Sequence, residues 1–205
     1  MTAFQATRVL GANDRVRLGV IGTGNRGCQV MEFFLQHADC EITAICDVSR
    51  STMDAANQKL LGGKAAAYTD FRQIIDKPDI DAVLIATPDH WHALQTVMAC
   101  RAGKDVYCEK PLAKTLYEGR KMVEVARETG RVVQVGTHRR SGLSYADAAN
   151  LIASNRLGKI TVARAYDTTN MFPLGIGKAA PSDPPQDLDW DMWLGPRPSR
   201  PFQAT

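Results

Sequence analysis

The sequence predicts an α/β fold with a doubly wound parallel sheet, followed by the incomplete start of an α+β second domain. Two observations carry this prediction. Up to about Gly136, short apolar runs alternate with amphipathic stretches of helical period, and a glycine-rich turn follows the first apolar run. Alternating strands and helices are typical of parallel sheets, because parallel neighbours need a crossover connection. A length of 205 residues suits one well-packed domain and part of another.

Five apolar runs predict the strands of the sheet. They are nearly continuous in apolar character, which is typical of strands that helices cover on both faces. The runs are Val16–Ile21, Ile42–Cys46, Ala82–Ala86, Val106–Cys108 and Val132–Val135.

Helical spacing between these runs predicts the crossover helices. Apolar side chains recur at helical spacing in two groups, which are Val30, Phe33 and Phe34, and then Trp91, Leu94 and Met98. A further helix has an N-terminal capping box made by Thr115 and Glu118, and Gly130 supplies its C-terminal stop.

Beyond Gly136 the pattern changes. The sequence predicts one helix at about 144–155, one strand at about 159–166 and a Pro-rich irregular stretch over 172–205. That stretch contains an apolar cluster, Leu188–Gly195, whose two Trp residues require a surface to pack against. The expected domains are an N-terminal extension (1–14), a cofactor-binding domain (15–138) and the truncated beginning of a substrate and oligomerisation domain (139–205).

Composition and charge argue against several classes of function. A net charge of +3, with no basic cluster larger than Arg139-Arg140, argues against a nucleic-acid partner. No stretch approaches the ~20 apolar residues of a membrane span, so we expect no membrane association. The first 14 residues carry no secretory signal, which predicts a cytoplasmic location.

Metal sites and disulfides are not expected. The five Cys residues include no C-x-x-C pair, and their odd number does not suit a disulfide framework. His90 and His92 are two positions apart, a spacing that does not bring both side chains to one face of a helix.

A glycine-rich fingerprint follows the first predicted strand and precedes a helix. It reads Gly22-Thr23-Gly24-Asn25-Arg26-Gly27. Gly22 would permit the tight turn, Gly24 the close approach of a pyrophosphate, and Gly27 the packing of the helix on the strand. The free amides and positive dipole end of the helix would hold the phosphates. This context predicts a dinucleotide-binding Rossmann domain, and the alternative is a purely structural turn.

Asp47 ends the second predicted strand, twenty positions after Gly27. A carboxylate there would accept hydrogen bonds from both adenosine ribose hydroxyls and would repel a 2′-phosphate. NAD is therefore the expected cofactor, with NADP less favoured. Arg50 leaves an alternative open, because its guanidinium could stack on adenine or accept the 2′-phosphate.

Two further motifs follow the fourth and fifth predicted strands. They are Thr87-Pro88-Asp89-His90-Trp91-His92 and Glu109-Lys110-Pro111. Ligands of open α/β sheets bind beyond the carboxyl ends of the strands, which is where both motifs fall. Trp91 is interpreted as a packing residue rather than as a platform for substrate.

Together these motifs resemble the glucose-fructose oxidoreductase, inositol 2-dehydrogenase and rhizopine-catabolism family. The resemblance covers the fingerprint, Asp47, "ATPDHWH", "AGKDVYCEKP", "VGTHRR" and "LDWDMWLGPRP", which is nearly the whole chain. It implies that Lys110 contacts the reacting hydroxyl or carbonyl and assists proton transfer. It also implies a set of residues around the cofactor, with Glu109 by the nicotinamide ribose, Thr87, Pro88 and His92 along the groove, and Arg139 near the nicotinamide and substrate end.

The function that follows is an NAD-dependent oxidoreductase acting on a secondary alcohol of a sugar, polyol or related compound. Hydride chemistry belongs to the cofactor, so the protein must supply an acid or base and polarise the carbon–oxygen bond. One alternative is an NAD-dependent glycosidase that acts by transient oxidation, although such relatives depart from the pattern at Lys110. Another is a non-catalytic dinucleotide-binding regulatory protein.

The resemblance also implies features outside this sequence. Relatives place an Asp and a His of the proton relay in a larger second domain, and full-length relatives associate as homo-oligomers. We therefore expect this chain to bind NAD but to turn over poorly. Relatives often carry a twin-arginine leader, so export is the alternative to a cytoplasmic location.

Overall fold

The computed structural model describes residues 15–166, 175, 177 and 179–204. It divides into two compact units, one within Met1–Gly136 and Pro184–Arg200, the other within Thr137–Asp183 and Pro201–Thr205. The sequence placed all of 139–205 in a second domain. In the structure, Pro184–Arg200 instead packs with the first unit, because its apolar cluster finds its packing surface there.

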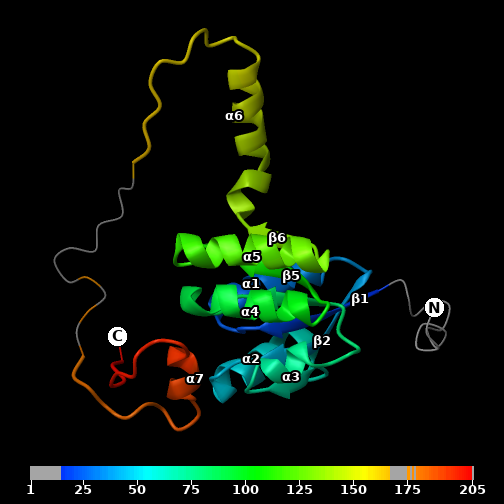
Figure 1. Cartoon of the computed structure of the whole chain (residues 1–205), viewed down its shortest axis with the longest axis vertical. Helices are drawn as coiled ribbons and strands as arrows, with labels where there is room; N and C mark the ends of the chain where they lie inside the picture. The colour runs from blue at the N-terminus through cyan, green and yellow to red at the C-terminus, as the bar shows by residue number, and fades with distance from the viewer. Residues whose placement is uncertain (1–14, 167–174, 176, 178, 205) are drawn as a thin grey trace. The chain divides into compact units, whose positions relative to one another are not determined.

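A six-stranded parallel sheet forms the centre of the first unit, in the order β3-β2-β1-β4-β5-β6 (Figure 1). The strands are β1 (Val16–Ile21), β2 (Cys40–Cys46), β3 (Ala66–Tyr68), β4 (Ala82–Ile85), β5 (Asp105–Glu109) and β6 (Val133–Gly136). The predicted doubly wound sheet is confirmed, and five of these strands overlap the five apolar runs. Since all strands are parallel, their carboxyl ends share one edge of the sheet.

Helices cover both faces of this sheet. They are α1 (Asn25–Phe34), α2 (Arg50–Leu61), α3 (Arg72–Ile75), α4 (Asp89–Arg101) and α5 (Leu116–Thr129). One apolar core lies between the strands and helices α1 and α2, and includes Leu18, Val20 and Met31. The other lies under α3, α4 and α5, and includes Ile85 and Met122. Helices α4 and α5 lie side by side (Figure 1).

The capping signals that the sequence predicted for α5 are confirmed. Thr115 Oγ1 accepts from the amide of Glu118, and the Glu118 carboxylate accepts from the amide of Thr115, at 3.2 and 3.0 Å. Gly130 ends the helix with a φ of 63°, in the left-handed region that glycine adopts without strain.

Within residues 15–136, three elements have no counterpart in the sequence prediction. Strand β3 is only three residues long and contains two Ala, so it presents no apolar run. Helix α2 buries only Met53, Ala56 and Asn57, which is too little for a visible apolar stripe. Its termini nevertheless carried signals, because Ser49 caps the N-terminus and Gly62 closes the C-terminus in the left-handed conformation. Helix α3 is a single turn.

The second unit contains a 3-10 helix (His138–Ser141) and helix α6 (Leu143–Ala153). Helix α6 confirms the prediction of a helix at about 144–155. The predicted strand at about 159–166 is wrong, because these residues form no strand and are exposed. An isolated strand cannot satisfy its own backbone hydrogen bonds, and the described residues give this segment no neighbouring strand.

Helix α7 (Trp190–Leu194) lies within the stretch that the sequence predicted as irregular. Asp189 caps it by accepting from the Met192 amide at 2.9 Å. The rings of Trp190 and Trp193 stack with centroids 4.8 Å apart, and Leu194 is buried. The surface that these Trp residues were predicted to require therefore lies within this chain.

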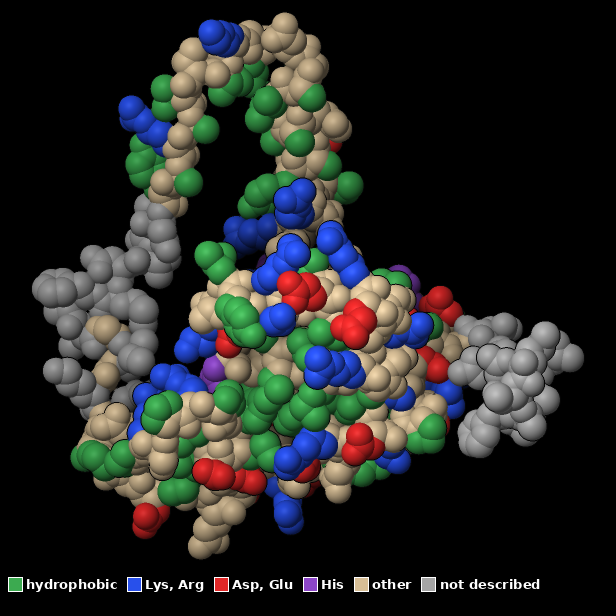
Figure 2. Space-filling view, viewed as in Figure 1, with side chains coloured by type: hydrophobic (Ala, Val, Ile, Leu, Met, Phe, Trp, Pro, Cys, Tyr) green, Lys and Arg blue, Asp and Glu red, His purple; other side chains and the backbone are tan. Residues whose placement is uncertain are grey.

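The surface of the first unit mixes apolar and charged side chains. In Figure 2, hydrophobic side chains gather across the middle of the face that carries α4 and α5, and charged side chains surround them. The exposed apolar residues of these helices include Leu94, Leu116 and Tyr117. Among the described residues, no helix has both the length and the apolar character needed to span a bilayer.

Candidate functional site

Two glycines of the fingerprint are fixed by close backbone packing. Gly22 has a φ of 93°, and a Cβ there would lie 2.7 Å from the backbone of Ala86 at the end of β4. A Cβ on Gly27 would overlap the carbonyl oxygen of Gly22. Only glycine allows the turn after β1 to pass this close to β4 and to α1.

Gly24 differs from the other two glycines. A Cβ at Gly24 would meet no atom within 4 Å, and its φ of −62° is open to any residue. The packing of this chain therefore gives no reason for a glycine here. Open space over Gly24 is what the approach of a bound pyrophosphate requires.

The N-terminus of α1 is free of side-chain caps. Gly24, the N-cap, has no side chain to accept a hydrogen bond, and the first turn contains no acidic residue. Asn25 Oδ1 instead accepts from Gln29 Nε2 one turn along the helix, at 3.3 Å. Uncapped amides at the positive end of a ten-residue helix are suited to an anionic ligand.

Asp47 lies at the carboxyl end of β2, anchored to the glycine-rich turn. Its Oδ2 accepts from the Thr23 amide at 2.7 Å and from Thr23 Oγ1 at 3.1 Å, while its Oδ1 accepts from the Ser49 amide at 3.0 Å. Thr23 is only 1% exposed, so its side chain orients Asp47 instead of facing a ligand. A carboxylate has about four acceptor positions, so it keeps capacity for further donors.

A cavity of about 320 Å³ opens between the carboxyl ends of β1, β2 and β4. Its lining residues are Ile21, Gly22, Gly24, Cys46, Asp47, Val48, Ser49, Thr52, Thr69, Phe71, Ala86, Thr87, Pro88, Trp91, Gln95, Leu188, Met192 and Trp193. The lining combines apolar side chains with a few polar groups, which is typical of a small-molecule site. Thr87 and Pro88, which the family resemblance implied along the cofactor groove, are among these lining residues.

Residues of the C-terminal segment form one wall of this cavity. Trp91 Nε1 donates to the carbonyl oxygen of Met192 at 3.0 Å, and His90 Nε2 lies 2.9 Å from that of Trp193. Trp91 is 8% exposed and packs edge-on against Phe71, as the packing interpretation predicts. The sequence analysis did not identify this wall, because only folding brings residues a hundred positions apart together.

Burial of His90 lowers the pKa of its imidazole, an effect that the Trp193 carbonyl partly opposes. Burial thus favours the neutral ring, whereas the contact with the Trp193 carbonyl favours the protonated ring.

His92 has a different environment from the cofactor groove that the family resemblance implied. Its side chain is 1% exposed and is not among the residues that line the cavity. Nδ1 lies 2.7 Å from the Pro111 carbonyl oxygen, and Nε2 lies 2.8 Å from that of Thr87. His92 therefore holds together the loops that follow β4 and β5.

Glu109 and Arg26 form an ion pair across the carboxyl edge of the sheet. Arg26 Nη2 donates to Glu109 Oε1 at 2.8 Å, and Glu109 is 3% exposed. This hydrogen bond raises the pKa of Arg26. Glu109 Oε2 also accepts from the Lys110 amide at 3.2 Å. The pair joins residues 83 positions apart, so no local signal could have revealed it.

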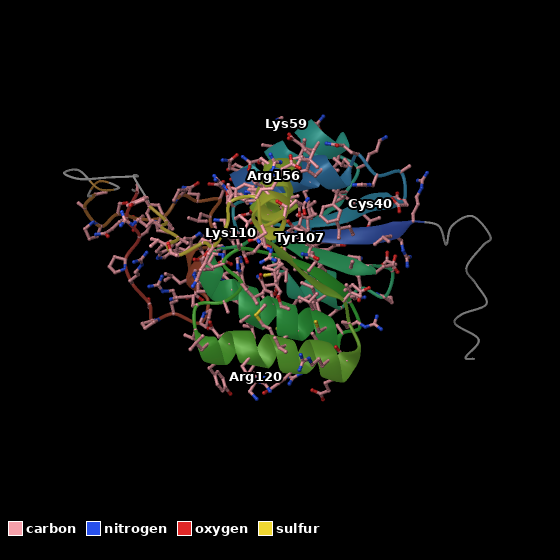
Figure 3. The ribbon with its side chains drawn as sticks, turned by 90° about the horizontal axis from the view of Figure 1, so that it is seen from above. Cys40, Lys59, Tyr107, Lys110, Arg120 and Arg156 are labelled. Atoms are coloured by element: carbon pink, nitrogen blue, oxygen red, sulfur yellow. The ribbon has the colours of Figure 1, made fainter. Side chains whose placement is uncertain are left out.

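Lys110 directly follows β5 at this edge, and its side chain is exposed. Figure 3 shows Lys110 toward the carboxyl ends of the strands and Cys40, which begins β2, toward the opposite edge. Lys110 and buried Glu109 therefore differ in how accessible their side chains are to a ligand. The lysine is open to a ligand, whereas the glutamate is engaged with Arg26.

The two remaining predicted residues, Arg50 and Arg139, are not among the residues that line the cavity. Arg50 begins α2 with an exposed side chain, and its amide donates to the Asp187 carbonyl oxygen at 2.9 Å. Arg139 belongs to the second unit, where its Nη1 donates to Tyr145 Oη at 3.4 Å. Its place near the nicotinamide stays a prediction.

Comparison with known proteins gives this site a family context. Residues 16–137 match the model of an oxidoreductase family with an NAD-binding Rossmann fold. The 1,5-anhydro-D-fructose reductase of Ensifer adhaerens is 38% identical over 111 residues, covering 54% of this chain and 33% of the relative. The inositol 2-dehydrogenase of Salmonella agona is 31% identical over 183 residues, covering 87% of this chain and 54% of the relative.

A glycosyl hydrolase family 109 protein of Shewanella sp. (strain MR-4) is 35% identical over 123 residues, covering 57% of this chain and 27% of the relative. The chain thus spans between about a quarter and about half of these relatives.

Solved structures of inositol dehydrogenases also resemble this chain. The scyllo-inositol dehydrogenase of Lactobacillus casei with bound NAD(H) and scyllo-inositol matches with a TM-score of 0.66 and 28% identity, covering 72% of this chain and 43% of that structure. The myo-inositol 2-dehydrogenase of Lactobacillus plantarum also has a TM-score of 0.66, at 29% identity. The match covers 71% of this chain and 43% of that structure. The chain belongs to the oxidoreductase family with an NAD-binding Rossmann fold, the family of glucose-fructose oxidoreductase and inositol 2-dehydrogenase.

Proposed function

We propose that this chain forms the cofactor-binding part of an NAD-dependent oxidoreductase that acts on a secondary alcohol of a sugar, polyol or related compound. One arrangement carries most of the proposal. Open space over Gly24 and the uncapped N-terminus of α1 lie next to the Asp47 carboxylate. These groups fit the pyrophosphate and the adenosine ribose of a dinucleotide.

The residues of the site divide into those that would hold the adenosine and pyrophosphate of the cofactor and those that would lie by its nicotinamide end. The amides at Gly24–Gly27 would bind the pyrophosphate, Asp47 the adenosine ribose hydroxyls, and the cavity the adenine. Glu109, which pairs with Arg26 beside the N-terminus of the same helix, α1, would lie by the nicotinamide ribose. Bound NAD would supply the hydride chemistry.

We assign the transfer of the substrate hydroxyl proton to Lys110. Its exposed side chain follows β5, so Nζ can donate a hydrogen bond to a substrate oxygen. The neutral amine would accept the hydroxyl proton as the alcohol is oxidised, and the ammonium would return it in the reverse direction. Glu109 is unsuited to this role, since it is buried and paired with Arg26. It would instead position the Lys110 backbone through the 3.2 Å hydrogen bond.

The substrate class follows from the relatives, whose names include an inositol 2-dehydrogenase and an anhydrofructose reductase. We extend a polyol or sugar substrate to this chain as part of the proposal. Preference for NAD over NADP, assembly as a homo-oligomer and a cytoplasmic location belong to the same proposal.

A glycosidase that acts by transient oxidation is the second candidate. The glycosyl hydrolase family 109 relative favours it. Lys110 favours the dehydrogenase, because the family resemblance implies that the glycosidase relatives depart from the Glu109-Lys110-Pro111 pattern at this lysine. Release of free sugar from an aryl glycoside without net formation of NADH would support the glycosidase instead.

The proposed function is tested by NADH formation, followed by absorbance, with NAD and a panel of inositols and anhydrohexitols. We expect Lys110→Met to lower kcat by about 10²- to 10⁴-fold and to leave NADH affinity unchanged. Lys114→Met, which removes an exposed lysine from the same loop, is the matched control and should retain activity. Unchanged turnover in Lys110→Met would rule out the assigned role. Weak turnover is expected of this chain, so NADH binding with no detectable NADH formation from any polyol would be needed to favour the regulatory alternative.

A further inference from the structure

A second carboxylate lies beside Asp47. Asp187, from the C-terminal segment, accepts through Oδ2 from the Ser51 amide at 3.2 Å and from the Ser51 hydroxyl. The Ser49 hydroxyl donates to the same oxygen at 3.5 Å. Ser49 thus contacts both carboxylates, since its amide donates to Asp47 Oδ1.

These donors surround the place where a 2′-phosphate would lie. Asp47 is positioned to bind the adenosine 2′-hydroxyl, so a phosphate on that hydroxyl would point toward the residues that follow β2. Two serine hydroxyls and an amide at the N-terminus of α2 are the kind of donors that bind phosphate. In this chain Asp187 already occupies the amide and the hydroxyl of Ser51, while the Ser49 hydroxyl has a nearer acceptor in Thr52 Oγ1, at 2.9 Å.

Several hydrogen bonds hold Asp187 in this position. Its carbonyl oxygen accepts from the Arg50 amide at 2.9 Å, and the Asp189 amide donates to the Val48 carbonyl oxygen at 2.9 Å. Leu188 forms an antiparallel bridge with Ser49 and lines the cavity. The segment is therefore fixed to the residues that follow β2.

We propose that Asp187 is a second determinant of cofactor specificity, which excludes the 2′-phosphate of NADP by occupying its donors and by repelling its charge. This inference rests on the proposed function of the site. It also answers the alternative that Arg50 raised. With Asp47 and Asp187 both present, two carboxylates oppose the Arg50 guanidinium, so the local charge disfavours a dianionic phosphate.

The test compares dissociation constants of NADH and NADPH for the wild-type chain and Asp187→Asn, measured by calorimetry. We expect the ratio of the NADPH constant to the NADH constant to fall about tenfold in Asp187→Asn, because the asparagine keeps the size but removes the charge. Asp54→Asn removes the same charge from an exposed position on α2 and should leave the ratio unchanged.

These outcomes distinguish a role of Asp187 in cofactor specificity from a role that only holds the C-terminal segment in place. If Asp187 only fastens the C-terminal segment, Asp187→Asn should weaken both nucleotides equally, and an unchanged ratio would overturn the inference. Wild-type protein that binds neither nucleotide would instead overturn the proposed function. As a second measurement, the ratio in the wild-type chain should fall as salt rises, and Asp187→Asn should lose part of that dependence. Equal salt dependence in both proteins would contradict repulsion by Asp187.

Discussion

Arg26 Nη2 lies 2.8 Å from Glu109 Oε1, so the glycine-rich fingerprint after β1 is joined directly to the Glu109-Lys110-Pro111 motif at the end of β5. Both residues belong to motifs that the sequence analysis assigned separately to the cofactor. Their contact means that the pyrophosphate end and the substrate end of the proposed site share one ion pair. Since Glu109 also accepts from the Lys110 amide, a change at Arg26 can reach Lys110 through a single side chain.

Arg26→Met should destabilise the fold, because it leaves the buried Glu109 carboxylate without its cationic partner. We expect a loss of about 1–3 kcal/mol in the free energy of unfolding, toward the lower end because Arg26 is itself 32% exposed. Urea denaturation measures this loss. The double variant Arg26→Met/Glu109→Gln should lose less than the sum of the two single variants.

Arg120→Met provides the control for this ion pair. Arg120 pairs with Glu124 on the exposed face of α5, with side chains 67% and 40% exposed. Its removal should change the free energy of unfolding by about 0.5 kcal/mol or less. Equal losses in the Arg26 and Arg120 variants would show that burial of Glu109 does not matter.

Gly24→Ala should separate ligand binding from folding. Its Cβ meets no atom of the chain, so the unfolding temperature should stay close to that of the wild type, whereas affinity for NADH should fall at least about tenfold. Gly27→Ala should instead lower the unfolding temperature, because its Cβ overlaps the Gly22 carbonyl oxygen. Thermal scans and NADH titration distinguish them. Undiminished NADH affinity in Gly24→Ala would contradict the assigned path of the pyrophosphate.

His92→Leu should loosen the loops after β4 and β5. The substitution removes the ring nitrogens that face the Thr87 and Pro111 carbonyl oxygens, and we expect a loss of about 1–3 kcal/mol in the free energy of unfolding. Turnover should fall more than NADH affinity, since Pro111 adjoins Lys110. His37→Leu, at an exposed position, should affect neither. A stable His92→Leu variant with full turnover would contradict the positioning role.

Acid should weaken the contact between α4 and α7 through His90. Burial lowers the pKa of His90 in the folded chain, so below the usual pKa of about 6.5 the unfolded chain binds more protons. The free energy of unfolding therefore falls as the pH drops from 6.5 through the lowered pKa. We expect the difference in this free energy between the wild type and His90→Gln to shrink over that range, as measured by urea denaturation at each pH. A difference that grows on acidification would contradict the predicted direction of this pH dependence.

Sequence reasoning succeeded where a signal is local. The strand, the glycines, the following helix and Asp47 fall within one βαβ unit, so their spacing alone predicts the turn, the helix terminus and a carboxylate at the end of the second strand. It failed where folding brings distant residues together, as in the pair of Arg26 with Glu109 and the contact of Asp187 with Ser51. It also failed at 159–166. The apolar composition there predicts a strand, but the described residues provide no neighbouring strand with which it could pair.

The most direct test of the account is calorimetric titration of the folded 205-residue chain with NADH. We predict saturable binding at a single site, weakened at least about tenfold by Asp47→Ala, which removes the acceptor of the ribose hydroxyls, and unaffected by Asp54→Ala on the exposed face of α2. Folded wild-type protein that releases no heat with NADH, or an Asp47→Ala variant that binds as tightly as the wild type, would contradict the account.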